Sequence, residues 1–111
     1  MAIHYAREQA SKIVKKLGAS ALPLRERLVE AYVGAFLPAL SDAEDQGYLP
    51  EDLDQTMRLL ANRMTALEAL GDEGTLHATL SRMTDHELEG CADDMIVIAL
   101  RILRLDTRRP G

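Results

Sequence analysis

The segment 41–54, SDAEDQGYLPEDLD, has acidic side chains and a glycine at spacings close to those of a calcium-binding loop. An EF-hand loop places oxygen ligands at its first, third and fifth positions, Gly at the sixth and a bidentate Glu at the twelfth. Counted from Asp42, the segment has Glu44 third, Gly47 sixth and Leu53 twelfth. Because Leu53 has no oxygen in its side chain, the bidentate ligand is missing. The sequence therefore predicts an acidic loop over 42–54, turned at Gly47, and no calcium site.

A second group of metal-ligating residue types lies in DHELEGCADD, at 85–94. Ligands on one helix must share a face, which requires spacings of three or four residues. His86 and Cys91 are five residues apart and would point about 140° away from each other on a helix. We therefore predict a helix start with a buried cysteine and no metal site.

Catalytic residues are not indicated by any local pattern. His4, His77 and His86 fall in three separate segments, and the acids beside Cys91 would raise the pKa of its thiol rather than activate it. The glycines of GDEG, at 71–74, surround two acids that would repel a phosphate. We predict no catalytic residue and no cofactor, and we expect a non-enzymatic protein.

The elements that would position these residues are helices, because apolar residues recur every three or four positions. The first helix is expected over 2–17, with Gly18 as a left-handed stop. The second begins at Pro23, and Pro38 should kink or end it. Their apolar faces comprise Ile3, Ala6, Ala10, Ile13 and Leu17 in the first, and Leu24, Leu28, Tyr32, Ala35 and Ala39 in the second.

Three further helices are expected in the second half of the chain. One begins at Pro50 and ends at Gly71, and a short one covers 75–82. The last covers 85–105 and begins with a capping box, in which Thr84 is the N-cap and Glu87 follows three residues later. The apolar seam of the first of these comprises Leu53, Met57, Leu60, Met64 and Leu67.

This pattern predicts an all-α fold, a bundle of four long helices and one short helix that are mostly antiparallel. The 111 residues fit a single domain over 1–105, followed by a frayed tail over 106–111. The single cysteine and the lack of a secretion signal or a long apolar run indicate a cytoplasmic protein, with no membrane partner.

Charge is distributed unevenly along the chain. The net charge of the chain is −5. Residues 42–94 carry many more acids than bases, and the regions on either side are basic. An acidic middle opposes nucleic acid as a partner, because binding to phosphates needs a basic face. It suits a basic protein partner or simple solubility.

Two surfaces are candidates for protein binding. The apolar arc of the last helix spans roughly 200°, which is wider than one neighbour covers. Ile96 and Leu100 lie on one edge of this arc and Val97 falls on the polar side. These three residues are a candidate self-association or partner patch, the alternative being that the helix is the middle of its own bundle. The acidic loop, with Asp42, Glu44 and Asp45, is a second candidate contact. We therefore expect an adaptor or regulatory protein that binds other proteins and forms a homodimer.

Two other functions fit the sequence less well. A small helical enzyme or ligand-binding protein would need a pocket among the helices at 2–17, 50–70 and 85–105, lined by convergent charged side chains. A DNA-associated regulator would use the basic ends of the chain, which carry Lys12, Lys15, Lys16, Arg108 and Arg109.

Overall fold

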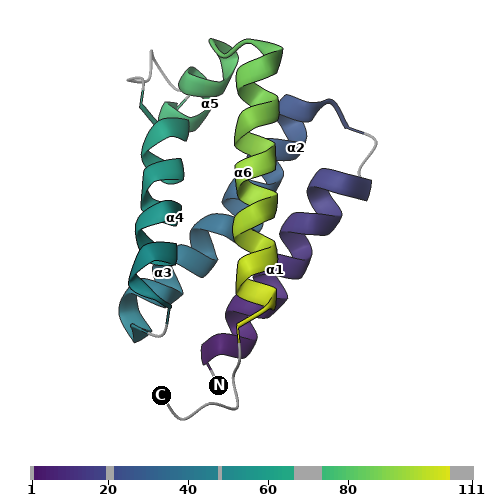
Figure 1. Cartoon of the computed structure of the whole chain (residues 1–111). Helices are drawn as coiled ribbons and strands as arrows, with labels where there is room; N and C mark the ends of the chain where they lie inside the picture. The colour runs from purple at the N-terminus through teal and green to yellow at the C-terminus, as the bar shows by residue number, and fades with distance from the viewer. Residues whose placement is uncertain (1, 20–21, 48, 67–73, 106–111) are drawn as a thin grey trace.

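A computed structural model describes residues 2–19, 22–47, 49–66 and 74–105, and every regular element in these ranges is helical (Figure 1). The elements are α1 (Ala2–Ala19), α2 (Leu24–Ala31), the π-helix η1 (Tyr32–Phe36), α3 (Leu37–Gln46), α4 (Glu51–Met64), α5 (Gly74–Ser81) and α6 (Asp85–Leu103). Within these ranges, no helix is both long enough and apolar enough to cross a membrane.

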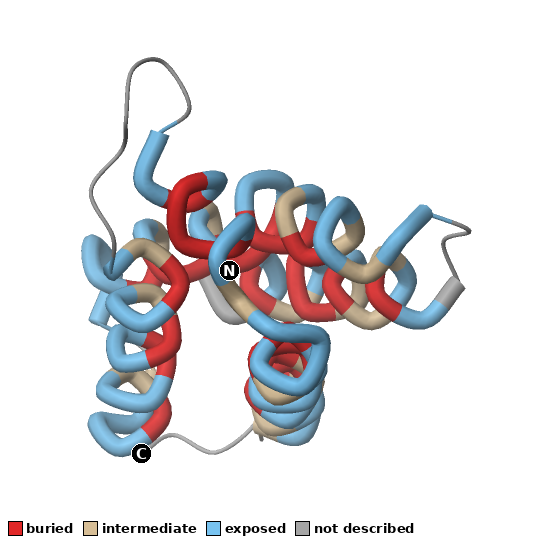
Figure 2. Tube along the Cα trace, turned by 90° about the horizontal axis from the view of Figure 1, so that it is seen from above, coloured by how far each residue is buried: buried red, intermediate tan, exposed pale blue. Residues whose placement is uncertain are grey.

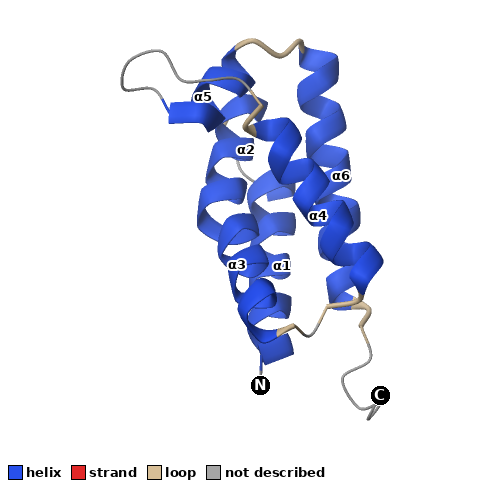
Figure 3. Ribbon diagram, turned by 90° about the vertical axis from the view of Figure 1, so that its left-hand side faces the viewer, coloured by secondary structure: helices blue, strands red, loops and turns tan. Residues whose placement is uncertain are grey.

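The helices form the predicted all-α bundle. Within it, α2, η1 and α3 follow one another without a break and make a single rod (Figure 3). With this rod counted once, the described residues contain four long helices and the short α5. Helix α6 lies at the front of the bundle and packs against α1, α4 and α2 (Figure 1). Arg7, near the start of α1, donates a hydrogen bond to the carbonyl oxygen of Leu105 just beyond α6, so these two helices run antiparallel.

The core is mostly aliphatic, with Tyr32 and Phe36 as its aromatic members, and lies where the helices face one another (Figure 2). The predicted seam of α4 is confirmed over its described part, since Leu53, Met57, Leu60 and Met64 are all buried. The same holds in α1 for Ala6, Ala10, Ile13 and Leu17. Among the described residues, only Gln9 and Thr79 are buried polar side chains. Burial of these apolar faces is the main force that holds the bundle together.

Pro38 was predicted to kink or end the helix; the rod continues through it but departs from regular α-helix geometry just before it. Proline donates no N–H, and its ring clashes with the carbonyl group four residues earlier. The helix widens into a π turn just before Pro38, where the N–H of Leu37 bonds to the carbonyl oxygen of Tyr32, five residues back. This turn makes room for the proline ring, and α3 then begins with Pro38 in its first turn.

Two predicted helix ends were wrong. Gly18 lies inside α1, and the described residues with positive φ are Gly47 and Gly74 alone. Helix α4 ends at Met64, well before Gly71, because Thr65 leaves the helical region with φ −124° and ψ 25°. What is contradicted is a continuous helix past Thr65; Gly71 itself and the predicted tail at 106–111 lie outside the described residues.

The segment 42–54 is mostly helical, so the expected acidic loop was also wrong. Residues 42–46 complete α3, whose buried Ala39, Leu40 and Ala43 extend its apolar face. The turn itself is confirmed, since Gly47 adopts the left-handed conformation with φ 68° and Pro50 is the N-cap of α4. The acids Asp42, Glu44 and Asp45 therefore project from a helix end.

Arginine side chains cap three helix ends from neighbouring elements. The last carbonyl groups of a helix have no partner within it, so each needs an outside donor. Arg27 of α2 donates to the carbonyl oxygen of Leu17 at 2.6 Å, and Arg25 donates to that of Leu80 at 3.0 Å. With Arg7 at the end of α6, these bonds join the ends of α1, α5 and α6 to other helices.

Gln9 gives a first prediction, because its amide oxygen is buried without a hydrogen-bond partner among the described residues. Such a group costs about 1–3 kcal/mol relative to a satisfied one. We expect Gln9→Leu to raise the free energy of unfolding by about 1 kcal/mol, measured by urea denaturation. The exposed Gln46→Leu is the control and should change it little. A destabilised Gln9→Leu variant would show that the amide has an unrecognised partner.

Candidate functional site: the groove between α4 and α6

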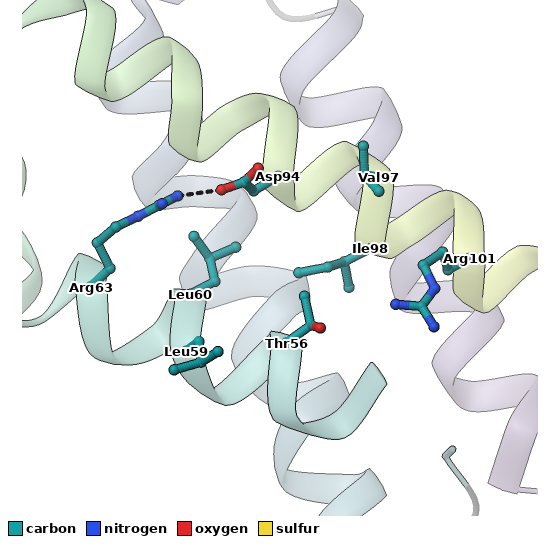
Figure 4. A pocket seen from close by; sticks show the side chains of 8 residues that line it. All are labelled: Thr56, Leu59, Leu60, Arg63, Asp94, Val97, Ile98 and Arg101. Carbon is teal, nitrogen blue, oxygen red and sulfur yellow. Dashed lines mark hydrogen bonds and ion pairs between the residues drawn. The ribbon is translucent and has the colours of Figure 1, made fainter. Parts of the chain in front are cut away.

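An open groove of about 440 Å³ runs between α4 and α6 (Figure 4). The chain brings eight residues to it, four from each helix. They are Thr56, Leu59, Leu60 and Arg63 of α4, and Asp94, Val97, Ile98 and Arg101 of α6.

The lining residues follow the same spacing in both helices, at positions i, i+3, i+4 and i+7. This spacing places four side chains on one helix face. In both helices, two apolar residues lie at the centre of the four and an arginine comes last. The sequence holds this signal, but the repeat becomes informative only when α4 and α6 are known to be neighbours.

The apolar residues of the groove divide into a floor and two rims. Leu60 and Ile98 lie between the helices and are only 4% and 1% exposed, so they form the floor (Figure 4). Leu59 and Val97 are 69% and 55% exposed and form the outer rims. Large apolar side chains exposed on both rims of one groove are typical of a surface that another molecule covers.

An Arg–Asp ion pair closes each end of the groove. Arg63 donates to Asp94 at 2.5 Å, and Arg101 donates to Asp52 at 2.6 Å. The hydrogen bond from Arg101 lowers the pKa of Asp52, and the bond to Asp94 raises the pKa of Arg63. Arg101 is partly exposed and the other three side chains are at least half exposed, and ion pairs of this kind contribute little to stability. They instead fix the positions of four charges around an apolar centre.

Cys91 lies beneath the Arg63 end of the groove and is buried, as predicted. Its Sγ is 3.9 Å from the sulfur of Met83. Burial raises the pKa of the thiol most, Arg63 partly opposes this, and the acids Asp94 and Glu87 add smaller increases. The site therefore offers no activated thiolate at neutral pH.

The predicted contact residues of the last helix lie on two different sides of α6. Val97 lines the groove, whereas Ile96 is half-buried against the core. Leu100 is exposed at 38% and does not line the groove. At about 100° per residue, Ile96 and Leu100 point about 150° and about 110° away from the centre of the groove-facing residues.

The predicted acidic contact lies at the far end of the rod. Asp42 is half-buried, and Glu44 and Asp45 are exposed. Glu44 comes within 3.9 Å of Arg58 in α4, which also binds Asp54 at 2.9 Å. The Glu44–Arg58 contact helps to join α3 to α4, and Leu53, at the twelfth position of the calcium-loop pattern, is buried in the core.

The remaining candidate residues are not brought together. His4, His77 and His86 are exposed on α1, α5 and α6. Across the described ranges, no three His, Cys, Asp or Glu residues are placed to hold a metal ion. Lys12, Lys15 and Lys16 line a surface hollow beside Gly34, where Lys16 lies 3.8 Å from Glu30.

Comparison of the chain with protein-family models, curated proteins and solved structures finds no match.

Proposed function

We propose that this protein is a non-enzymatic adaptor or regulatory protein that acts by binding another polypeptide through the groove between α4 and α6. The observation that carries the proposal is the exposure of Leu59 and Val97 on the two rims of one groove. Covering them would remove apolar surface from water, while the charged groove ends would form a polar rim.

The chemistry of the groove favours binding over catalysis. Its charged side chains are joined in Arg–Asp pairs, and its floor is aliphatic. The nearby thiol of Cys91 has a raised pKa. This arrangement supplies a contact surface with fixed charges and no activated nucleophile.

We further propose a cytoplasmic location and a second contact at the end of α3. The single cysteine is unpaired, which suits a reducing compartment. Asp42, Glu44 and Asp45 suit a basic protein partner through their charge. This second contact is independent of the groove.

Photo-cross-linking tests the proposed function. A photoreactive amino acid at position 97 is expected to join the chain to a second polypeptide in cells that express it. Position 33 is the matched control, since Val33 is also 55% exposed but lies in η1. We expect at least about tenfold more adduct from position 97, as for a residue inside a specific interface. Equal or absent adducts at the two positions would contradict a protein-binding groove.

A further inference from the structure

The charges around the groove are arranged in the same order on both helices. Along α4 the acid Asp52 comes before the base Arg63, and along α6 the acid Asp94 comes before the base Arg101. The ion pairs join Arg63 to Asp94 and Arg101 to Asp52, so the two helices run antiparallel. Each end of the groove therefore holds one acid and one base, on opposite helices.

This arrangement is complementary to itself. Two grooves can face each other about a two-fold axis that lies in the plane of the interface. If this axis runs across the helices, α4 of one copy meets α4 of the other in the opposite direction, and Asp52 faces Arg63 of the other copy. If the axis is parallel to the helices, α4 meets α6 and Arg63 faces Asp94 of the other copy. Either axis places acids opposite bases, as an isologous interface requires.

The apolar residues meet in the same arrangements. Along α6, Val97 and Ile98 lie midway between Asp94 and Arg101, whereas along α4 Leu59 lies seven residues after Asp52 and four before Arg63. Leu59 and Val97 flank the centre of the groove, so the rims of two copies would meet across either axis. Each end of the groove holds one acid and one base, so it is polar with no net charge, and the centre is apolar. This matches the polar rim and apolar core of protein interfaces.

We infer that the polypeptide bound in the groove is a second copy of this chain, packed about a two-fold axis with α4 and α6 of both copies forming a four-helix interface. The inference rests on the proposed function and names its partner. It follows from the self-complementary order of Asp52, Arg63, Asp94 and Arg101 around exposed apolar rims.

Two variants of opposite charge test the inference directly. Arg63→Glu with Arg101→Glu makes all four groove charges negative, and Asp52→Arg with Asp94→Arg makes all four positive. Like charges then face one another in each homodimer about either axis, whereas the mixture restores acids opposite bases. The four side chains are between 38% and 74% exposed, so both variants should fold, which circular dichroism checks.

Sedimentation equilibrium gives the readout. We expect the wild-type chain to reach twice its 12.3 kDa mass with rising concentration, each variant alone to stay at 12.3 kDa, and their equimolar mixture to regain the doubled mass. Leu59→Glu should raise the dimer Kd by about tenfold or more, and the matched Val33→Glu should leave it unchanged.

A wild-type chain that stays at 12.3 kDa up to about 100 µM, a range that covers weak specific dimers, would overturn the inference. Folded variants whose mixture fails to dimerise would overturn it as well. If position 97 cross-links to other proteins while the purified chain stays monomeric, the inference that the groove binds a second copy is wrong, and the proposed function stands. If position 97 yields no adduct, both fail.

Discussion

Phe36→Ala is expected to lower the free energy of unfolding by about 4 kcal/mol, the largest effect of any single truncation considered for this chain. Phe36 is fully buried in the π turn, and its ring stacks on Tyr32 with centroids 5.5 Å apart. Truncation removes buried apolar surface and leaves a cavity that the rod cannot close by shifting, because Pro38 fixes the helix just beyond it.

The neighbouring Leu37→Ala is the matched control for this experiment. Leu37 is 44% exposed, so the same kind of truncation should cost less than about 1 kcal/mol. Urea denaturation at low protein concentration measures both variants and limits any contribution from association. Similar losses of unfolding free energy in Phe36→Ala and Leu37→Ala would mean that the π turn does not determine which of these two side chains is buried.

Ala10→Leu is expected to lower the free energy of unfolding by about 3 kcal/mol, the second largest effect. Ala10 is fully buried on α1, which packs against α6, α2, η1 and α3. Small residues such as Ala6 and Ala10 let these helices approach α1 closely, since interhelical distance depends on the side chains at the contact. Three added carbon atoms would force the surrounding helices apart.

The exposed Lys12→Leu variant separates packing from helix propensity. Leu and Lys are similarly good helix formers, so this change should alter stability by less than about 0.5 kcal/mol. Thermal unfolding followed by circular dichroism gives the comparison. A stable Ala10→Leu variant would show that α1 has free space beside it and that its alanines do not set the helix spacing.

The sequence predicted the features of the fold that depend on short-range patterns. The four-and-three spacing of Leu53, Met57, Leu60 and Met64 correctly identified the buried face of α4. Thr84 and Glu87 form the predicted capping box, with both reciprocal hydrogen bonds present. Patterns of this kind are local, because the physical cause and its effect lie within one or two helical turns.

Features that depend on neighbouring helices were missed. The glycine at position 18 looked like a stop, but the carbonyl group beside it, that of Leu17, is capped by Arg27 and α1 continues to Ala19. Pro38 was predicted to kink or end the helix; the helix does not end, because a π turn within the same rod accommodates the proline. A neighbouring helix therefore contributes at Gly18, whereas at Pro38 the backbone itself adjusts.

The candidate site was predicted only at Val97. The groove is formed by residues far apart in the sequence, since Arg63 pairs with Asp94 and Arg101 with Asp52. No pattern within one helix reveals which face of α4 lies beside α6. Once that neighbour is known, the matching order of acid, apolar pair and arginine on the two helices indicates the site.

The arginine caps have a consequence for how this bundle comes apart. Isolated helices ordinarily lose structure from their tips inward, but the tips of α1, α5 and α6 are hydrogen-bonded to arginines that belong to other helices. Loosening one tip therefore means breaking a bond between two helices rather than within one. A fragment that lacked α1 and α2 would lose the side-chain donors at the end of α5 and just beyond α6, while the end of α4, which is closed by its own backbone, would be unaffected.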